Sequence, residues 1–345
     1  MDYRQLPKIE LHLHLDCSLS YQVVQQLDPT VTRSQFDNEF IAPLPALDLV
    51  EYINRSSRGY LLMQTAAQLR LVTLDVLRQL DADGVLYAEL RFAPLLHTQQ
   101  GLSPTQVVEA VQDALTEATS LYRVIPRLIL CTLRHYTEAE SMETVRLVEK
   151  FIPQGWVVGF DIAGPEDGFP PTNQLETFEY LRKENAHFTI HAGEAYGLPS
   201  IWEAIQICGA ERLGHGVRII DDIDFSSSTP KLGALASYIR DRRIPLELCP
   251  TSNLQTGAVK TYSEHPIGKL AKLRFRVTLN TDNRLMSNTS MSNEMTQCVK
   301  SFDWKFADLQ RVTVNALKSS FIPFEERLEI IEKIIKPGYA AIASE

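Results

Sequence analysis

Short apolar segments rich in β-branched residues recur along the whole chain. Each has the length and composition of a buried strand. They cover residues 8–15, 85–93, 126–133, 157–164, 188–194, 212–217, 245–252 and 276–283. Between most of them lie longer segments whose apolar residues recur at helical spacing. The pattern therefore predicts eight strands that alternate with helices.

Helix start signals support this alternation. Ser103 and Thr229 are each followed by proline and then by apolar residues at helical spacing, as at a helix N-terminus. Thr137 and Glu140 have the spacing of a capping box. We therefore expect helices to begin just after Ser103, Thr137 and Thr229.

Strands that alternate with helices pair in parallel through right-handed crossovers. Eight such units favour a (β/α)8 barrel, with an open doubly wound sheet as the alternative. The segment 17–84 is longer than one crossover needs and contains a helical pattern from Leu69 to Leu80, so part of it is expected to cap the barrel mouth. The residues after Met291 are expected to add helices at the C-terminus. Residues 1–345 are predicted to form one domain.

The composition and net charge indicate which kinds of binding partner to expect. The 345 residues are 44% hydrophobic and 22% charged, as in a globular protein with a sizeable core. A net charge of -9 disfavours nucleic acid as a partner, because binding it needs clustered Lys and Arg. No apolar segment approaches the roughly 18 residues of a membrane span, the start lacks a signal-peptide pattern, and the five cysteines are widely spaced. We expect a cytoplasmic protein with a small-molecule ligand and no membrane partner.

Polar residues gather at the ends of the predicted strands, where the active sites of (β/α)8 barrels lie. The first strand runs into His12, His14 and Asp16, and the alternation of side chains along a strand places all three on one face. Two imidazoles on one face suit zinc, although a hydrogen-bonded histidine pair is the structural alternative.

Further polar groups follow three other strands. The fifth ends with His191 and Glu194, the sixth carries His215 between glycines, and the eighth ends with Asp282 and Asn283. Each alone has a structural explanation, a tight turn for His215 and a helix cap for Glu194 or Asp282. Independent caps and turns would not gather four histidines and two acids at one end of a barrel. We therefore predict one site.

Three histidines and one aspartate offer three nitrogen ligands and one oxygen, which suits zinc and leaves a position for water. The predicted ligands are His12, His14, His191 and Asp282. A two-metal site would need a bridging group, commonly a lysine at the end of the fourth strand, but that strand ends Asp161-Ile162-Ala163-Gly164. One zinc ion per chain is expected.

With HLHLD, AG, HAGE, GHG and TDN in this order at predicted strand ends, the chain resembles the adenosine and adenine deaminase family of metal-dependent hydrolases. The resemblance spans about residues 8–294 and implies the same four zinc ligands. It implies that Glu194 delivers a proton to purine N1 while His215 and Asp282 hold the attacking hydroxide. The implied substrate contacts are the Gly164 amide to N3, Asn283 to N7, and Asp16 to a ribose hydroxyl, with His14 beside it.

The resemblance implies hydrolytic deamination of adenosine, and of 2′-deoxyadenosine, in purine salvage. Members that act on free adenine have Glu at the position of Asp16, and those that act on methylated nucleotides have Asn, so Asp16 favours a nucleoside. The alternatives are deamination of adenine or of another 6-aminopurine compound, of the aminodeoxyfutalosine or N6-methyl-AMP kind, and a non-catalytic zinc-binding relative. Glu194 and His215 argue against the last, because a structural metal needs no proton donor.

Three positions depart from the family pattern: Cys17 replaces a glycine, Asn283 replaces an aspartate, and Pro165 replaces an acidic residue. None of these positions is a predicted zinc ligand. Outside the motifs, His97, His135, His187 and His265 are interpreted as structural or surface residues, Cys249 as a core residue, and Glu89 and Arg91 as a pair.

Overall fold

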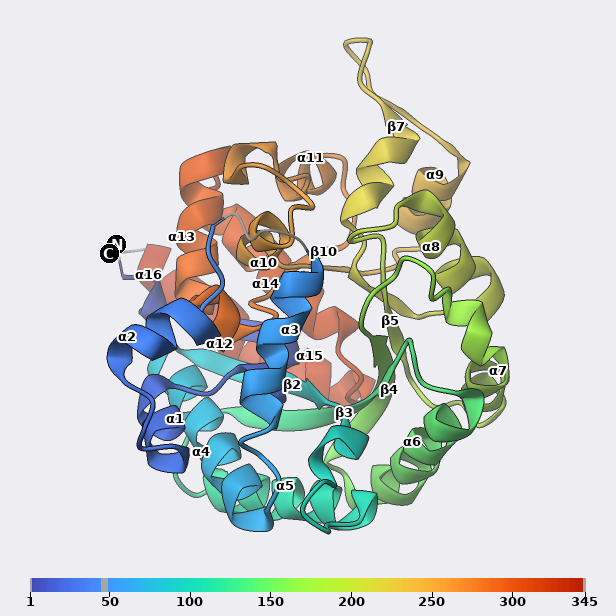
Figure 1. Cartoon of the computed structure of the whole chain (residues 1–345). Helices are drawn as coiled ribbons and strands as arrows, with labels where there is room; N and C mark the ends of the chain where they lie inside the picture. The colour runs from blue at the N-terminus through green and yellow to red at the C-terminus, as the bar shows by residue number, and fades with distance from the viewer. Residues whose placement is uncertain (1, 45–48, 344–345) are drawn as a thin grey trace.

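The computed structural model describes residues 2–44 and 49–343. Two four-stranded parallel sheets form its centre, one with the order β1-β2-β3-β4 and one with the order β10-β9-β6-β5 (Figure 1). The strands are β1 (Lys8–His14), β2 (Val85–Phe92), β3 (Ile125–Leu133), β4 (Val157–Ala163), β5 (Thr189–Ala192), β6 (Arg212–His215), β9 (Leu246–Leu248) and β10 (Val277–Leu279).

The two sheets join into a ring of eight parallel strands. Isolated parallel bridges link Phe160 of β4 to Phe188 beside β5, and Leu13 of β1 to Asp282 beyond β10. At the second junction the backbone N–H of Asp282 donates to the carbonyl of His12 at 2.8 Å. The ring confirms the predicted (β/α)8 barrel over the open sheet, and it brings Asp282 next to the histidines of β1.

Helices surround the ring and extend the C-terminal part of the chain (Figure 1). They are α1 (Tyr21–Leu27), α2 (Arg33–Gln35), α3 (Leu49–Tyr60), α4 (Ala66–Ala82), α5 (Pro104–Ala118), α6 (Glu138–Phe151), α7 (Leu175–Lys183), α8 (Leu198–Trp202), α9 (Ala234–Asp241), α10 (Pro250–Gln255), α11 (Ile267–Lys272), α12 (Arg284–Ser287), α13 (Met291–Phe302), α14 (Phe306–Ser319), α15 (Phe324–Ile330) and α16 (Lys336–Ala343). The expected helices after Met291 are present. Ser103 and Thr137 cap α5 and α6, as predicted, and the capping box expected at Thr137 is present. Ser103 forms a second complete capping box, which the sequence analysis did not predict.

The helix start predicted at Thr229 is wrong. Thr229 instead lies between the strands of a two-stranded antiparallel hairpin, β7 (Ile223–Asp224) and β8 (Lys231–Leu232), which projects from the barrel (Figure 1). Helix α9 begins only at Ala234, and the N–H of Ala236 donates to the side chain of Asp222 at 2.8 Å. An acidic residue from before the hairpin therefore satisfies the helix terminus that Thr229 was expected to cap.

Several strands end earlier than the apolar pattern predicts. β5 ends at Ala192 and β9 at Leu248, because Pro250 already begins α10. The residues predicted at the last positions of these strands instead lie in loops and helix starts at the mouth. Such positions are free of the strand's alternation, so their side chains can turn toward a common point.

Helix α3 lies across the open end of the ring (Figure 1). A Cβ on Gly59 of α3 would lie 2.3 Å from the carbonyl oxygen of Asp16, so only glycine permits this close approach to the end of β1. The prediction that part of the segment 17–84 caps the mouth is thus correct. The core of the protein is one hydrophobic cluster, which contains buried residues from Leu6 to Tyr339.

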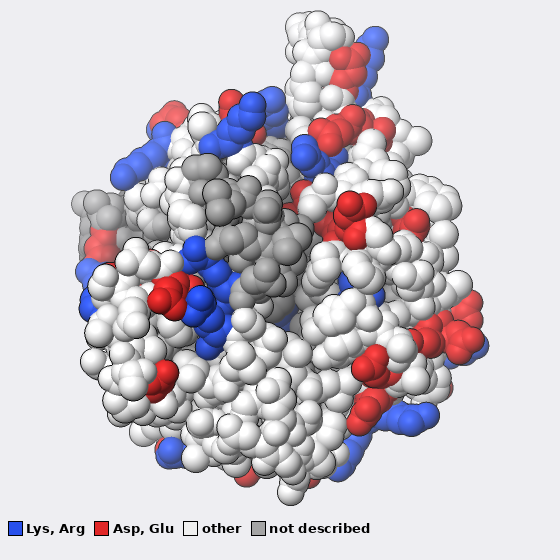
Figure 2. Space-filling model, viewed as in Figure 1, with Lys and Arg blue, Asp and Glu red and all other residues white. Residues whose placement is uncertain are grey.

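The outer surface carries mixed charge. Over the described residues of the face in Figure 2, Lys and Arg lie in small groups among Asp and Glu, as on a solvated surface. Within residues 2–44 and 49–343, none of the helices combines the length and the apolar character needed to cross a bilayer.

Candidate active site

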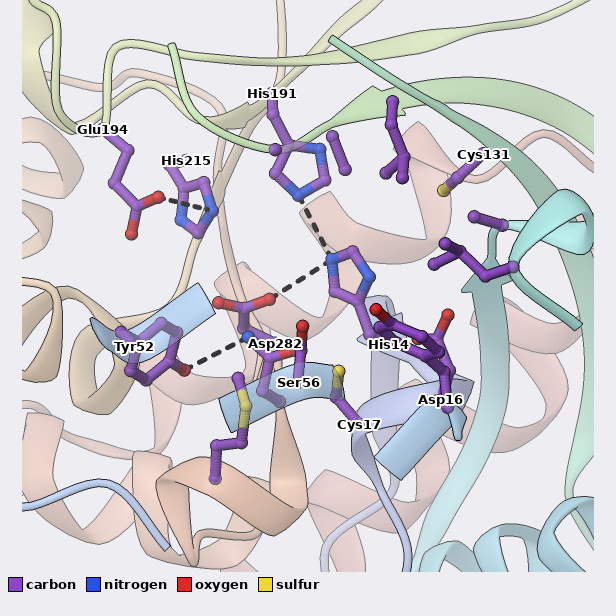
Figure 3. A pocket seen from close by; sticks show the side chains of 18 residues that line it. His14, Asp16, Cys17, Tyr52, Ser56, Cys131, His191, Glu194, His215 and Asp282 are labelled. Atoms are coloured by element: carbon purple, nitrogen blue, oxygen red, sulfur yellow. Dashed lines mark hydrogen bonds and ion pairs between the residues drawn. The ribbon is translucent and has the colours of Figure 1, made fainter. Parts of the chain in front are cut away.

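A pocket opens at the end of the ring where the strands finish. It encloses about 760 Å³, counting the space at its open end, which is within the range of small-molecule sites. Its lining includes eight of the nine residues predicted from the sequence: His14, Asp16, Gly164, His191, Glu194, His215, Asp282 and Asn283 (Figure 3). The ninth, His12, is fully buried, with its ring 4.5 Å from that of His191.

Four side chains converge at the centre of this pocket. The ligand atoms of His12, His14, His191 and Asp282 all lie within 4.8 Å of one another. The Nε2 atoms of His14 and His191 are 3.2 Å apart, and Asp282 Oδ1 lies 3.3 Å from His12 Nε2. His12 Nε2 is buried without a hydrogen-bond partner, which a cation at the centre would remedy. Three imidazole nitrogens and a carboxylate oxygen are a donor set that can hold a metal ion.

Carboxylates hold the second nitrogen of two of these rings. His12 Nδ1 lies 2.9 Å from Glu247 Oε2, and His191 Nδ1 lies 3.0 Å from Asp161 Oδ2. Such partners place the ring proton on Nδ1 and leave Nε2 free for a metal. The sequence analysis missed both carboxylates. The sequence did contain a signal for them, because each is the single acidic residue of an apolar strand. A buried carboxylate needs a charged or hydrogen-bonding partner.

Two buried arginines balance these acids. Arg91 lies 2.6 Å from Asp161 and 2.8 Å from Glu247. Arg212 lies 2.7 Å from Glu247 and 2.7 Å from Glu89. The expected pair of Glu89 with Arg91 is therefore wrong, because side chains inside a closed ring reach across to other strands instead of pairing along their own.

Burial sets the protonation of the ligand set. It lowers the pKa of His14 to about 4 and that of His191 well below its usual range. Burial opposes the charge of Asp282, but the facing His12 ring outweighs it and holds the pKa of this carboxyl below its usual range. Near neutral pH His14 and His191 are therefore neutral and Asp282 is a carboxylate, the forms that bind a metal. Burial and Arg91 oppose the charge of the His12 ring, but Asp282 and Glu247 outweigh them and raise its pKa.

Two site residues have backbones in the left-handed region. The φ angles of His215 and Asp282 are 63° and 62°. Non-glycine residues held there cost about 1–3 kcal/mol and tend to occur at functional sites. Neighbouring backbone bonds hold both turns, including that from Gly216 N–H to the Ala192 carbonyl at 3.0 Å. This strain supports a functional interpretation of His215 over a simple tight turn.

Glu194 lies beside His215, with Oε2 3.5 Å from His215 Nε2. Its Oε1 accepts hydrogen bonds from Asn253 Nδ2 at 3.1 Å and from Thr256 Oγ1 at 2.9 Å. Burial raises the pKa of Glu194, so this carboxyl can retain a proton at a higher pH than an exposed one. The sequence analysis did not identify Asn253 or Thr256, although both follow the seventh predicted strand.

The loop that carries Glu194 is anchored by Glu166. This carboxylate accepts the backbone N–H groups of Gly193, Glu194 and Ala195 at 2.9, 2.7 and 3.1 Å. The sequence analysis noted Pro165 in place of an acidic residue. An acidic residue, Glu166, follows Pro165 directly, and the sequence analysis did not identify it.

The remaining predicted residues line other walls. Asp16 Oδ2 lies 3.7 Å from His97 Nε2, and although burial opposes ionisation, His97 helps to lower the pKa of Asp16. Gly164 has a φ of 103°, which a side chain would strain. Asn283 Nδ2 donates to the hydroxyl of Tyr52 on α3 at 3.1 Å. Figure 3 shows Glu194 and His215 on the side of the pocket opposite Asp16, with His14, His191 and Asp282 between them.

Comparisons with known proteins identify relatives along nearly the whole chain. A family model described as adenosine deaminase matches residues 7–337. Adenosine deaminase 1 of Streptomyces coelicolor is 49% identical over 99% of this chain and 89% of its own length. Adenosine deaminase of Mycobacteroides abscessus is 49% identical over 98% of this chain and 96% of its own length. The solved adenine deaminase of Arthrobacter aurescens has a TM-score of 0.85 at 21% identity and covers 99% of this chain and 100% of its own, which shows a shared fold.

Proposed function

The chain belongs to the adenosine deaminase family, and we propose that it hydrolyses adenosine and 2′-deoxyadenosine to the 6-oxo nucleosides and ammonia, as an enzyme of purine salvage. One observation carries the proposal: Glu194 and His215 stand in contact at one side of a cluster of four convergent ligand atoms, inside a single pocket. Asp16 lies on the opposite side (Figure 3). A nucleoside fits this arrangement with its base toward Glu194 and its ribose toward Asp16.

We propose that His12, His14, His191 and Asp282 hold one zinc ion per chain. Zinc supplies a Lewis acid that makes hydroxide available from water near neutral pH. Near neutral pH His14 and His191 are neutral and Asp282 is charged, so these three ligands need no deprotonation before a metal binds. Asp282 also accepts a hydrogen bond at Oδ2 from Ser252 at 2.6 Å, which fixes the carboxylate while Oδ1 faces the histidines.

Glu194 delivers a proton to purine N1, which weakens the aromaticity of the ring and prepares C6 for attack. His215 and Asp282 hold the incoming oxygen and manage its proton. The bond from oxygen to C6 forms, the remaining hydroxyl proton passes to the amino nitrogen, the bond from C6 to that nitrogen breaks, and ammonia leaves. The Gly164 amide and Asn283 would hold N3 and N7, and His14 and Asp16 would lie at the ribose. Asn283 needs no protonated acid to donate to N7.

An ultraviolet assay with adenosine, 2′-deoxyadenosine and adenine, each with and without a zinc chelator, tests the proposal. We expect both nucleosides to be converted, adenine to remain, and the chelator to abolish activity until zinc is restored. Conversion of adenine alone would overturn the nucleoside assignment. Inactivity on all three substrates would favour another 6-aminopurine nucleoside or a non-catalytic role.

Replacing Asp16 by alanine is expected to raise KM for adenosine roughly 10- to 100-fold, because a hydrogen bond to a charged group contributes about 1.5–3 kcal/mol. The kcat/KM for any residual adenine turnover should stay unchanged, since adenine has no ribose. Steady-state kinetics measure both, with Asp221→Ala on the surface as the control. Equal losses on the two substrates would argue that Asp16 does not contact ribose.

Replacing Thr256 by valine is expected to move the alkaline limb of the kcat/KM profile to higher pH by up to about one unit. The Thr256 hydroxyl donates to the Glu194 carboxylate and so lowers its pKa. Without this bond the pKa rises, and Glu194 keeps its proton over a wider range. Thr256→Ser, which retains the hydroxyl, is the control. An unchanged or lowered alkaline limb in the valine variant would contradict the role of Glu194 as the acid.

We also propose that residues 1–345 form a single domain, because one hydrophobic cluster contains residues from both ends of the chain. A single cooperative unfolding transition, followed by both circular dichroism and tryptophan fluorescence, is the expected result.

A further inference from the structure

One buried amide contacts both residues to which the proposed function gives proton-handling roles. Asn253 on α10 is fully buried. Its Nδ2 lies 3.1 Å from Glu194 Oε1 and 3.2 Å from His215 Nδ1, and its Oδ1 lies 3.1 Å from His265 Nε2. Neither Asn253 nor His265 is among the described residues that line the pocket, so both act on the site from behind.

The surroundings of His265 determine which of its nitrogens carries the proton. Its Nδ1 accepts the backbone N–H of Ile267 at 3.2 Å, so the proton of the neutral ring is on Nε2. Burial lowers the pKa of His265 to about 3, and the ring is therefore neutral near neutral pH. His265 Nε2 must then donate to the oxygen of Asn253.

This donor fixes the orientation of the Asn253 amide. With Oδ1 toward His265, Nδ2 faces the site, and its two hydrogens match its two neighbours there, Glu194 Oε1 and His215 Nδ1. His215 Nδ1 is then an acceptor, which leaves the proton of the neutral ring on Nε2. His215 Nε2 is the atom that lies 3.5 Å from Glu194 Oε2.

We propose that His265 and Asn253 are a positioning pair that selects the Nε2–H tautomer of His215 and orients the Glu194 carboxyl. The proposal rests on the proposed function for the roles of His215 and Glu194. Its direct consequence is that His215 presents a hydrogen-bond donor, not an acceptor, to the oxygen that attacks C6. The pair touches no reacting atom, and its effect on turnover passes entirely through His215 and Glu194.

Asn253→Asp tests the pair with almost no change in volume. The new carboxylate still accepts from His265 but offers no hydrogen to His215, so His215 should change to the Nδ1–H tautomer. We expect kcat for adenosine to fall at least about 10²-fold, as for a misplaced proton in other acid–base sites, with KM changed less than about threefold. The tautomer is read in the zinc-loaded protein by 15N NMR of labelled histidine, with His215→Gln identifying the signal.

A second pair of variants separates positioning from packing. His265→Gln keeps a donor toward Asn253 and should retain kcat within about threefold, whereas His265→Phe lacks it and should lower kcat about tenfold or more. Asn315→Asp on α14, whose amide donates to the Val277 carbonyl at 3.3 Å, is the matched control and should leave kcat unchanged.

Three results would overturn the proposal: an Nδ1–H tautomer of His215 in the wild type, an unchanged tautomer and kcat in Asn253→Asp, or a loss of thermal stability in that variant with kcat and KM unaltered. Failure of the proposed function is a separate outcome. It would appear as a wild type inactive on adenosine, while the NMR measurement would still decide whether the pair sets the tautomer.

Discussion

Glu194→Gln is expected to lower kcat for adenosine at least about 10²-fold, the usual loss when a general acid is removed, while zinc content and substrate binding stay close to wild type. Glutamine retains an oxygen that can accept from Asn253 and Thr256, the two donors that now hold Glu194 Oε1. Its amide can donate a hydrogen bond to purine N1 but cannot transfer the proton. We therefore expect the Glu194→Gln variant to bind zinc and substrate but to convert the substrate slowly.

Metal analysis, calorimetric binding of a slowly converted purine riboside and steady-state kinetics measure the three quantities. Glu211→Gln is the control, because Glu211 is exposed, pairs with His187 and precedes β6, whose opposite end carries the pocket residue His215. Turnover near that of the wild type in Glu194→Gln would exclude Glu194 as the proton donor to N1.

Glu247→Gln should weaken zinc binding about 10- to 100-fold and lower the free energy of unfolding by about 3–5 kcal/mol. Glu247 is fully buried and lies 2.9 Å from His12 Nδ1, 2.8 Å from Arg91 and 2.7 Å from Arg212. Burial opposes its charge, yet the two guanidinium groups lower its pKa well below its usual range. Loss of this carboxylate leaves excess positive charge in the barrel interior and loosens the His12 ring.

Chelator competition measures the zinc affinity, and urea unfolding of the metal-free protein measures the stability without a contribution from zinc binding. The comparison variant is Glu329→Gln, an exposed partner of Lys333, which should change stability by less than about 1 kcal/mol. If Glu247→Gln kept both the zinc affinity and the stability of the wild type, the support that Glu247 gives to His12 would be disproved.

Local patterns were sufficient to predict the barrel and the residues at its mouth. His12 and His14 lie two residues apart at the end of β1, and this spacing alone predicts that they share a face. Asp16 was expected to continue the alternation, but β1 ends at His14 and Asp16 lies in a 3-10 turn after it. His191 and Asp282 follow other apolar strands, and parallel strands in a barrel end at the same rim. These inferences need only periodicity and strand direction, which neighbouring residues in the chain determine. They place the residues in one site without stating which atoms meet.

Only the tertiary structure decided the contacts behind that site. Glu247 reaches His12 across 235 positions of sequence, Asn253 reaches Glu194 across 59, and each pair forms only because the ring closes. The prediction of Thr229 as a helix cap was wrong for a similar reason. Asp222, which precedes the hairpin in the chain, accepts a hydrogen bond from the first turn of α9.

The sequence by itself determined the alternation of strands and helices, the chemistry at the strand ends and the family to which that chemistry belongs. The tertiary structure determined which atoms meet in the site, the hydrogen-bond partners of the Glu194 carboxyl and the partners of the buried charges. The physical reason is that a strand's alternation is a property of adjacent residues. A buried polar atom, in contrast, must find its partner wherever the closed fold brings one within hydrogen-bonding distance.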